Sequence, residues 1–139
     1  MNSVEIKALV TGRASRFGER NPQQYQQLVD RLGKADGREV ANGLLRVFID
    51  GRPPPGGSAA QEIAGALLME LTPKGDFDLT DMLRQALKRY ELSVEQFPQY
   101  LAKTYGRSVV LDALSHVESE NLTASEQRAV HTMRFWLKA

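Results

Sequence analysis

The chain has 139 residues, with 18 basic and 17 acidic side chains and no cysteine. This length suffices for one domain with its own apolar core, and the near-neutral charge excludes a strong long-range attraction to nucleic acid or anionic lipid. Without cysteine there are no disulfides or thiolate metal sites, and no stretch is long and apolar enough to span a membrane, so we expect a cytoplasmic protein with no membrane partner.

Apolar residues recur at helical spacing along the whole chain, and no segment shows the sustained alternation of a strand. The stripes lie in residues 25–32, 40–48, 79–90, 110–117 and 130–137, the last widened by Phe135 and Trp136. The segment 58–71 is apolar on nearly every side, which is typical of a helix surrounded by neighbours. Together with an N-terminal helix, these stripes predict an all-α fold. We expect one domain over residues 1–139, with seven or eight short helices in antiparallel pairs.

Helix start signals precede most of these stripes. Capping patterns occur at Ser58–Gln61, Ser93–Gln96, Thr123–Glu126, Asn21–Gln24 and Asp36–Glu39. Pro98 falls within the second turn of the helix predicted after Ser93, where proline removes a backbone hydrogen bond. We therefore expect a kink or a late helix start at this proline.

Two segments of the chain are weakly similar to each other. Leu28, Gly33, Arg38 and Leu45 align with Leu101, Gly106, Arg107 and Leu114, interrupted by one short insertion. In both segments a helix ends at glycine and the next helix begins almost at once. This pattern resembles the helix-turn-helix unit of HEAT-like α-α repeat proteins, over about half of the chain. The resemblance implies a repeat-like stack with an elongated binding surface, and an irregular helical bundle is the alternative.

The segment 51–57 has nearly the spacing of a phosphate-binding loop, but not its chemistry. Its three consecutive prolines lack the backbone N–H groups that such a loop points at phosphates, and Gly57 stands in place of the lysine. We interpret this segment as a Pro/Gly connector between two helices. Arg52 and Pro54 within it are candidates for contact with a partner.

One cluster of carboxylates, Asp76, Asp78 and Asp81, suggests a metal site. The glycine and closing glutamate of a calcium loop are absent, and Asp78 and Asp81 fit the start of a helix as cap and first-turn acid. Neither His116 nor His131 has a ligand partner at helical spacing. We therefore predict no catalytic residue, no metal and no cofactor.

Basic side chains give a second functional hypothesis. Arg13, Arg16 and Arg20 share one helical face, and Arg84 and Lys88 lie on another, so that together they could contact a phosphate backbone. Acidic residues are interspersed among them, which is also typical of a solvated helix surface. Binding of nucleic acid, or a regulatory role using these faces, is the alternative hypothesis.

A third feature points to recognition of another protein. We expect Tyr100 near the edge of its helix's buried stripe and flanked by Lys103 and Arg107, an arrangement typical of interface anchors. The leading hypothesis is therefore a non-enzymatic protein-binding module. Within that class, a bacterial adaptor or a toxin-neutralising immunity protein fits the size and the lack of motifs.

Overall fold

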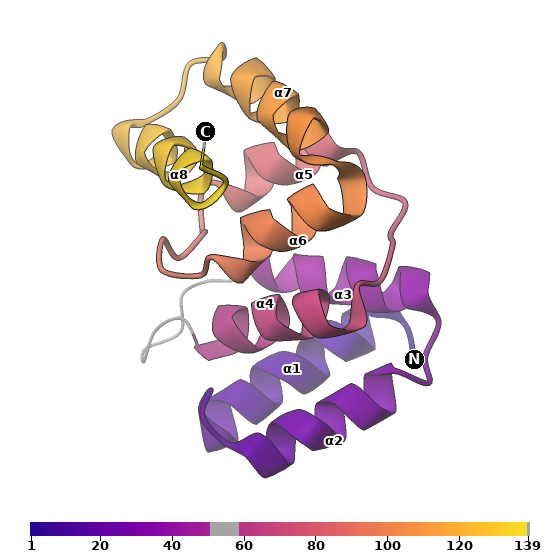
Figure 1. Ribbon diagram of the computed structural model, residues 1–139. Coiled ribbons are helices and arrows are strands. Elements are labelled where there is room, and N and C mark those ends of the chain that lie inside the picture. Colours follow the sequence, from indigo (N-terminus) through magenta and orange to yellow (C-terminus); the bar gives the residue numbers. More distant parts are fainter. Residues whose placement is uncertain (51–58, 139) are drawn as a thin grey trace.

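The computed structural model describes residues 1–50 and 59–138, and within these ranges every regular element is an α-helix. The helices are α1 (Ser3–Phe17), α2 (Pro22–Leu32), α3 (Gly37–Ile49), α4 (Ala59–Leu71), α5 (Leu79–Ala86), α6 (Gln96–Tyr105), α7 (Arg107–Glu118) and α8 (Ala124–Trp136). They pack directly against one another (Figure 1), so the predicted all-α fold is confirmed.

The helices form two groups of four. In Figure 1, α1 to α4 occupy the lower part of the molecule and α5 to α8 the upper part, and the groups meet mainly where α4 packs on α6 and α3 on α5. In addition, α4 contacts α1, α2 and α3. Its Ala64, Leu67 and Leu68 are fully buried, so the prediction of a central helix in this segment is confirmed.

Several helix starts follow the predicted local chemistry. Asn21 caps α2 and Asp78 caps α5, each by accepting a hydrogen bond from a backbone N–H in the first turn. Thr123 and Glu126 form the complete capping box of α8, in which each side chain bonds the other residue's backbone N–H. The caps therefore fix the first residues of α5 and α8, two helices that carry the candidate surfaces described below.

The start of α6 agrees with one prediction and corrects another. The helix begins at Gln96, so Pro98 lies in its first turn, where a backbone N–H has no partner within the helix. The expected late start is confirmed. The predicted cap at Ser93 is wrong, because Ser93 lies in the preceding turn and Glu95 occupies the cap position without a side-chain hydrogen bond.

The two segments that resemble each other turn differently. Gly106 connects α6 to α7 as a single residue with φ of 102°, a conformation that side chains disfavour, whereas Gly33 has φ of −62° and α3 begins only at Gly37. The helices α6 and α7 pack on each other, while α2 packs on α4 and α1. A HEAT-like repeat remains a prediction from the sequence pattern.

Candidate functional site

Tyr100 is buried, and its predicted role as an exposed interface anchor is wrong. Its side chain has 0% exposure, and its hydroxyl donates a hydrogen bond to the backbone carbonyl of Pro73 in the segment between α4 and α5. Its ring meets the ring of Tyr105 edge-on, with centroids 6.3 Å apart. Burial raises the pKa of Tyr100 well above its usual value. Because α4, α7 and α8 all pack on α6, little of this helix's circumference faces water.

The other residues predicted for partner contact have different surroundings. Lys103 is exposed on α6. Arg107 is exposed, but its guanidinium donates hydrogen bonds of 3.0 Å to the backbone carbonyls of Leu137 and Lys138, so it holds the end of α8. Arg52 and Pro54 lie outside the described residues. The structure therefore does not assemble the predicted patch around Tyr100.

The basic residues of the nucleic-acid hypothesis fall into two groups. Arg13 is half-buried and donates to the side-chain oxygens of Gln24 and Gln27 at 2.7 and 3.2 Å. Arg84 is paired with Asp81 and Glu120. Arg16, Arg20 and Lys88 are exposed, and the guanidinium of Arg16 lies 5.2 Å from the ring centre of Phe17. Because Arg13 and Arg84 are already engaged, fewer cations remain for phosphate groups than the sequence suggests.

The carboxylates of the 76–81 cluster each have a separate partner. Asp76 accepts a hydrogen bond from the Asn42 side-chain amide at 3.0 Å, and this bond, with Arg38 nearby, lowers the pKa of Asp76. Asp78 caps α5, and Asp81 pairs with Arg84. Within residues 1–50 and 59–138, no three carboxylate or imidazole groups converge as metal ligands.

A pocket of about 370 Å³ lies between α3 and α5. The charged groups of its lining already have partners: Arg46 binds Asp50 at 3.2 Å, Asp76 accepts a hydrogen bond from the Asn42 amide, and Asp78 and Asp81 are engaged as described above. The side-chain oxygen of Asn42 is buried without a hydrogen-bond partner. The pocket therefore offers few unengaged charged groups to a ligand.

The outer side of α8 carries an aromatic residue that the sequence analysis had assigned to the apolar stripe. Phe135 is 68% exposed, the largest exposed fraction among the big apolar side chains in the described ranges. Its ring meets that of Trp136 edge-on at 5.1 Å, and the Trp136 indole N–H donates to the Leu92 carbonyl at 2.9 Å. Phe135 lies about 200° around the helix from the buried Met133, which accounts for its exposure.

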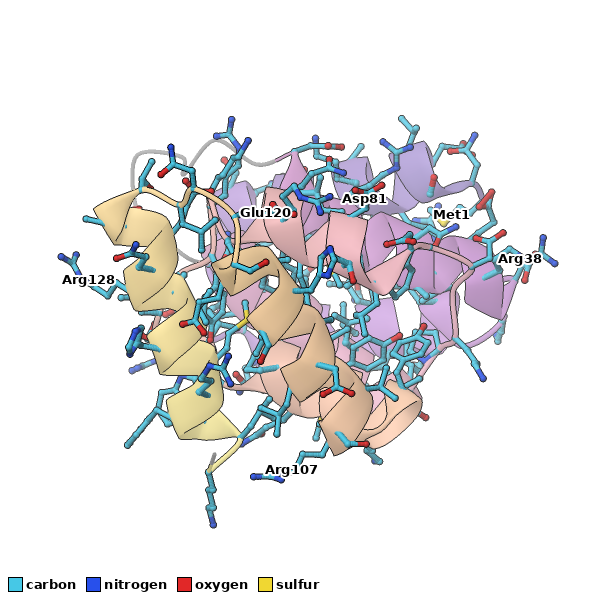
Figure 2. All side chains as sticks on the ribbon, turned by 90° about the horizontal axis from the view of Figure 1, so that it is seen from above. Met1, Arg38, Asp81, Arg107, Glu120 and Arg128 are labelled. Carbon is cyan, nitrogen blue, oxygen red and sulfur yellow. The ribbon has the colours of Figure 1, made fainter. Side chains whose placement is uncertain are left out.

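Two exposed cations flank Phe135 along the chain. Arg128 lies on the same side of α8, two helical turns before it, whereas Lys138 follows the end of the helix, in a turn where its φ is 57°. Neither side chain forms an ion pair with any residue that the structure describes. Figure 2 shows Arg128 extending from α8 into solvent. We call Arg128, Phe135 and Lys138 the α8 stripe.

Sequence analysis missed the α8 stripe, although a signal for it exists. Val130, Met133 and Leu137 define the buried side of α8, and a helical wheel drawn on them places Phe135 on the opposite side. The prediction that Phe135 widens the apolar stripe of this helix is therefore wrong. The seven-residue spacing of Arg128 and Phe135 therefore predicts a shared exposed face.

A groove of about 420 Å³ lies between the start of α5 and α7. Its lining consists of Asp78, Leu79, Thr80, Val109, Asp112, Ala113 and His116. Val109 is 49% exposed and, with Leu79 and Ala113, forms the apolar part of the lining. The carboxylate of Asp112 is exposed and has no ion-pair partner among the described residues. We call this feature the α5–α7 groove.

Comparison of the chain with protein-family models, with curated proteins and with solved structures finds no match. No helix within the described ranges has the length and apolar character needed to cross a membrane.

Proposed function

We propose that the chain is a non-enzymatic protein-binding module and that its docking face is the α8 stripe. The observation that carries this proposal is a phenylalanine 68% exposed and flanked along the chain by two cations that have no ion-pair partner among the described residues. Aromatic and arginine side chains contribute most of the binding energy in many protein interfaces. A single exposed apolar residue is common on protein surfaces, so the argument depends on the combination with Arg128 and Lys138.

The contacts that fix α8 to its neighbouring segments favour a docking role for its outer side. Trp136 is anchored to the Leu92 carbonyl, Arg134 pairs with Glu118 at 2.9 Å, and Arg107 holds the last carbonyls of the helix. These contacts hold α8 against its neighbours while its outer side stays open. A face that is ordered before binding loses less conformational entropy when a partner docks.

The charge pattern favours a protein partner over nucleic acid. The α8 stripe has two cations without an ion-pair partner in the described part of the chain, and Glu118 and Asp112 lie on the neighbouring helix α7. Nucleic-acid interfaces depend on neutralising several phosphates, which requires a larger basic excess. A protein surface with one or two carboxylates around an apolar contact fits the α8 stripe better.

Within this class, we propose an adaptor or a toxin-neutralising immunity protein acting in the cytoplasm. The small all-helical fold and the near-neutral charge support this finer hypothesis by analogy of fold alone. The alternative, binding of nucleic acid through Arg16, Arg20 and Lys88, is kept as an outcome of the experiment below.

Affinity capture tests the proposal. The chain is immobilised through its N-terminus, and proteins retained by the wild type are compared with those retained by Phe135→Asp and by Arg128→Glu. Val4→Asp is the matched control, because Val4 is 59% exposed but lies on α1. We expect proteins that bind the wild type and the Val4 variant to be lost from both α8 variants.

Retention of the same proteins by Phe135→Asp would contradict a docking role for α8. A gel-shift titration with generic DNA and RNA addresses the alternative function. Binding that weakens with salt and disappears when Arg16, Arg20 and Lys88 are changed to glutamate would support nucleic-acid recognition instead.

A further inference from the structure

The α8 stripe and the α5–α7 groove have complementary chemistry. The stripe presents an aromatic ring between two cations, and the groove presents an apolar lining with the carboxylates of Asp78 and Asp112. We propose that the α8 stripe of one molecule docks into the α5–α7 groove of a second copy of this chain. This inference rests on the proposed function, because it uses the same face of α8 and names one partner for it.

The groove is open at the surface, so the ring of Phe135 from another molecule can reach its lining. Leu79, Val109 and Ala113 line the groove with aliphatic carbon. Docking removes both Phe135 and Val109 from water, and they are among the most exposed apolar side chains on the described surface.

The charges of the two surfaces also correspond. Arg128 precedes Phe135 on the same side of α8 by about 10 Å in axial rise, and Lys138 lies beyond the end of the helix. Asp112 lies on α7, on one side of the groove, and Asp78 lies at the start of α5, on the other. Because Asp112 has no ion-pair partner among residues 1–50 and 59–138, an incoming arginine does not have to displace an ion pair within that part of the chain.

The contact has to be between molecules. In each chain two contacts fix α8 to the rest of the fold. Arg134 pairs with Glu118 of α7, and the Trp136 indole N–H donates to the Leu92 carbonyl. Phe135 therefore points away from its own helices and cannot enter the groove of its own chain. Since stripe and groove are different surfaces and each copy offers one of each, copies associate either head-to-tail or as a reciprocal pair in which both contacts form.

One helix face in one groove forms a small interface, at the low end of the range for specific complexes. We therefore expect self-association with a Kd of about 10 µM to about 1 mM. A second copy bound at α8 also covers the proposed docking face, so self-association competes with the capture of other proteins.

Sedimentation velocity over a range of chain concentrations tests this inference. The wild type is expected to increase in average mass as its concentration rises. Phe135→Asp, Arg128→Asp and Asp112→Arg are each expected to weaken association at least about tenfold. The double variant carrying Arg128→Asp and Asp112→Arg is expected to recover association, because each head-to-tail contact then pairs the exchanged charges. Val4→Asp is expected to associate like the wild type.

A wild-type chain that remains monomeric up to millimolar concentration would overturn the inference. So would association that the exchanged charges fail to restore, or that Asp112→Arg leaves unchanged. Loss of captured proteins in Phe135→Asp together with a monomeric wild type would leave the proposed function standing and this inference refuted. Loss of captured proteins in Asp112→Arg without any self-association would assign the groove to a different, cationic partner, which also refutes it.

Discussion

The guanidinium of Arg84 on α5 binds the carboxylate of Glu120 through two hydrogen bonds, from Nε at 2.8 Å and from Nη2 at 2.7 Å. Glu120 follows the end of α7, so this bidentate pair fastens α5 to the turn that leads into α8. Figure 2 shows Glu120 and Asp81, the second partner of Arg84, on the same side of the molecule. The pair thereby holds the connection between the end of α7 and the start of α8 against α5.

Replacing Arg84 by methionine is expected to lower the melting temperature at neutral pH. The hydrogen bond from Arg84 lowers the pKa of Glu120, so its stabilising effect is present above the usual glutamate pKa and is lost as the pH falls through the lowered value. The difference in Tm between wild type and variant should therefore shrink toward acidic pH and with added salt. Thermal unfolding followed by circular dichroism measures both trends. An equal difference at all pH values would contradict this assignment.

Replacing Tyr100 by phenylalanine is expected to destabilise the fold by about 1 to 3 kcal/mol. The substitution keeps the ring and leaves the buried Pro73 carbonyl without its donor. Tyr25→Phe is the matched control, because the Tyr25 hydroxyl donates to Glu70 at 3.2 Å at the surface, and it should cost less. Urea unfolding gives both free energies. A smaller loss for Tyr100→Phe than for Tyr25→Phe would show that the buried hydrogen bond contributes little.

Replacing Gly43 by alanine is expected to destabilise the chain by about 1 to 3 kcal/mol. A Cβ atom at this position in α3 would lie 2.7 Å from the Cβ of Ile6 and 2.9 Å from the carbonyl of Ser3, so α1 and α3 would have to separate. Gly12→Ala on α1 is the control, since a Cβ there meets nothing within 4 Å, and helix propensity predicts a gain of up to about 1 kcal/mol. Opposite signs for the two variants are therefore expected in urea unfolding.

Replacing Glu62 by glutamine is expected to raise the melting temperature at neutral pH. Burial, followed by the negative charge of Glu19, raises the pKa of Glu62 above its usual 4.5. A raised pKa in the folded state means that wild-type stability is fully present below the unfolded pKa and declines as the pH rises through the folded value. The advantage of glutamine should therefore disappear at acidic pH. A Tm series across pH tests this sign, and a variant less stable than the wild type at neutral pH would contradict it.

Local signals in the sequence predicted much of the fold. A cap acts within one helical turn, so Asn21, Asp78 and Thr123 could be assigned from their neighbours alone. The apolar segment of α4 likewise indicated its own burial. The late start at Pro98 followed from the missing N–H of proline.

The candidate site could not be predicted in the same way, because its residues depend on partners far along the chain. The hydroxyl of Tyr100 donates to a carbonyl 27 positions earlier, and Arg84 is paired with a carboxylate 36 positions later. Such pairs leave no periodic signal. The α5–α7 groove similarly joins the start of α5 to α7, and it exists only once both helices are packed.

Trp136 is the only tryptophan of the chain, and its indole is bonded to the segment that precedes α6. Tryptophan fluorescence therefore comes from a single site, the contact between α8 and the segment that precedes α6. Release of α8 would expose this indole to water and shift its emission, while the ellipticity of the other helices persisted. The separation between the emission and ellipticity transitions during unfolding thus measures how independently the last helix attaches.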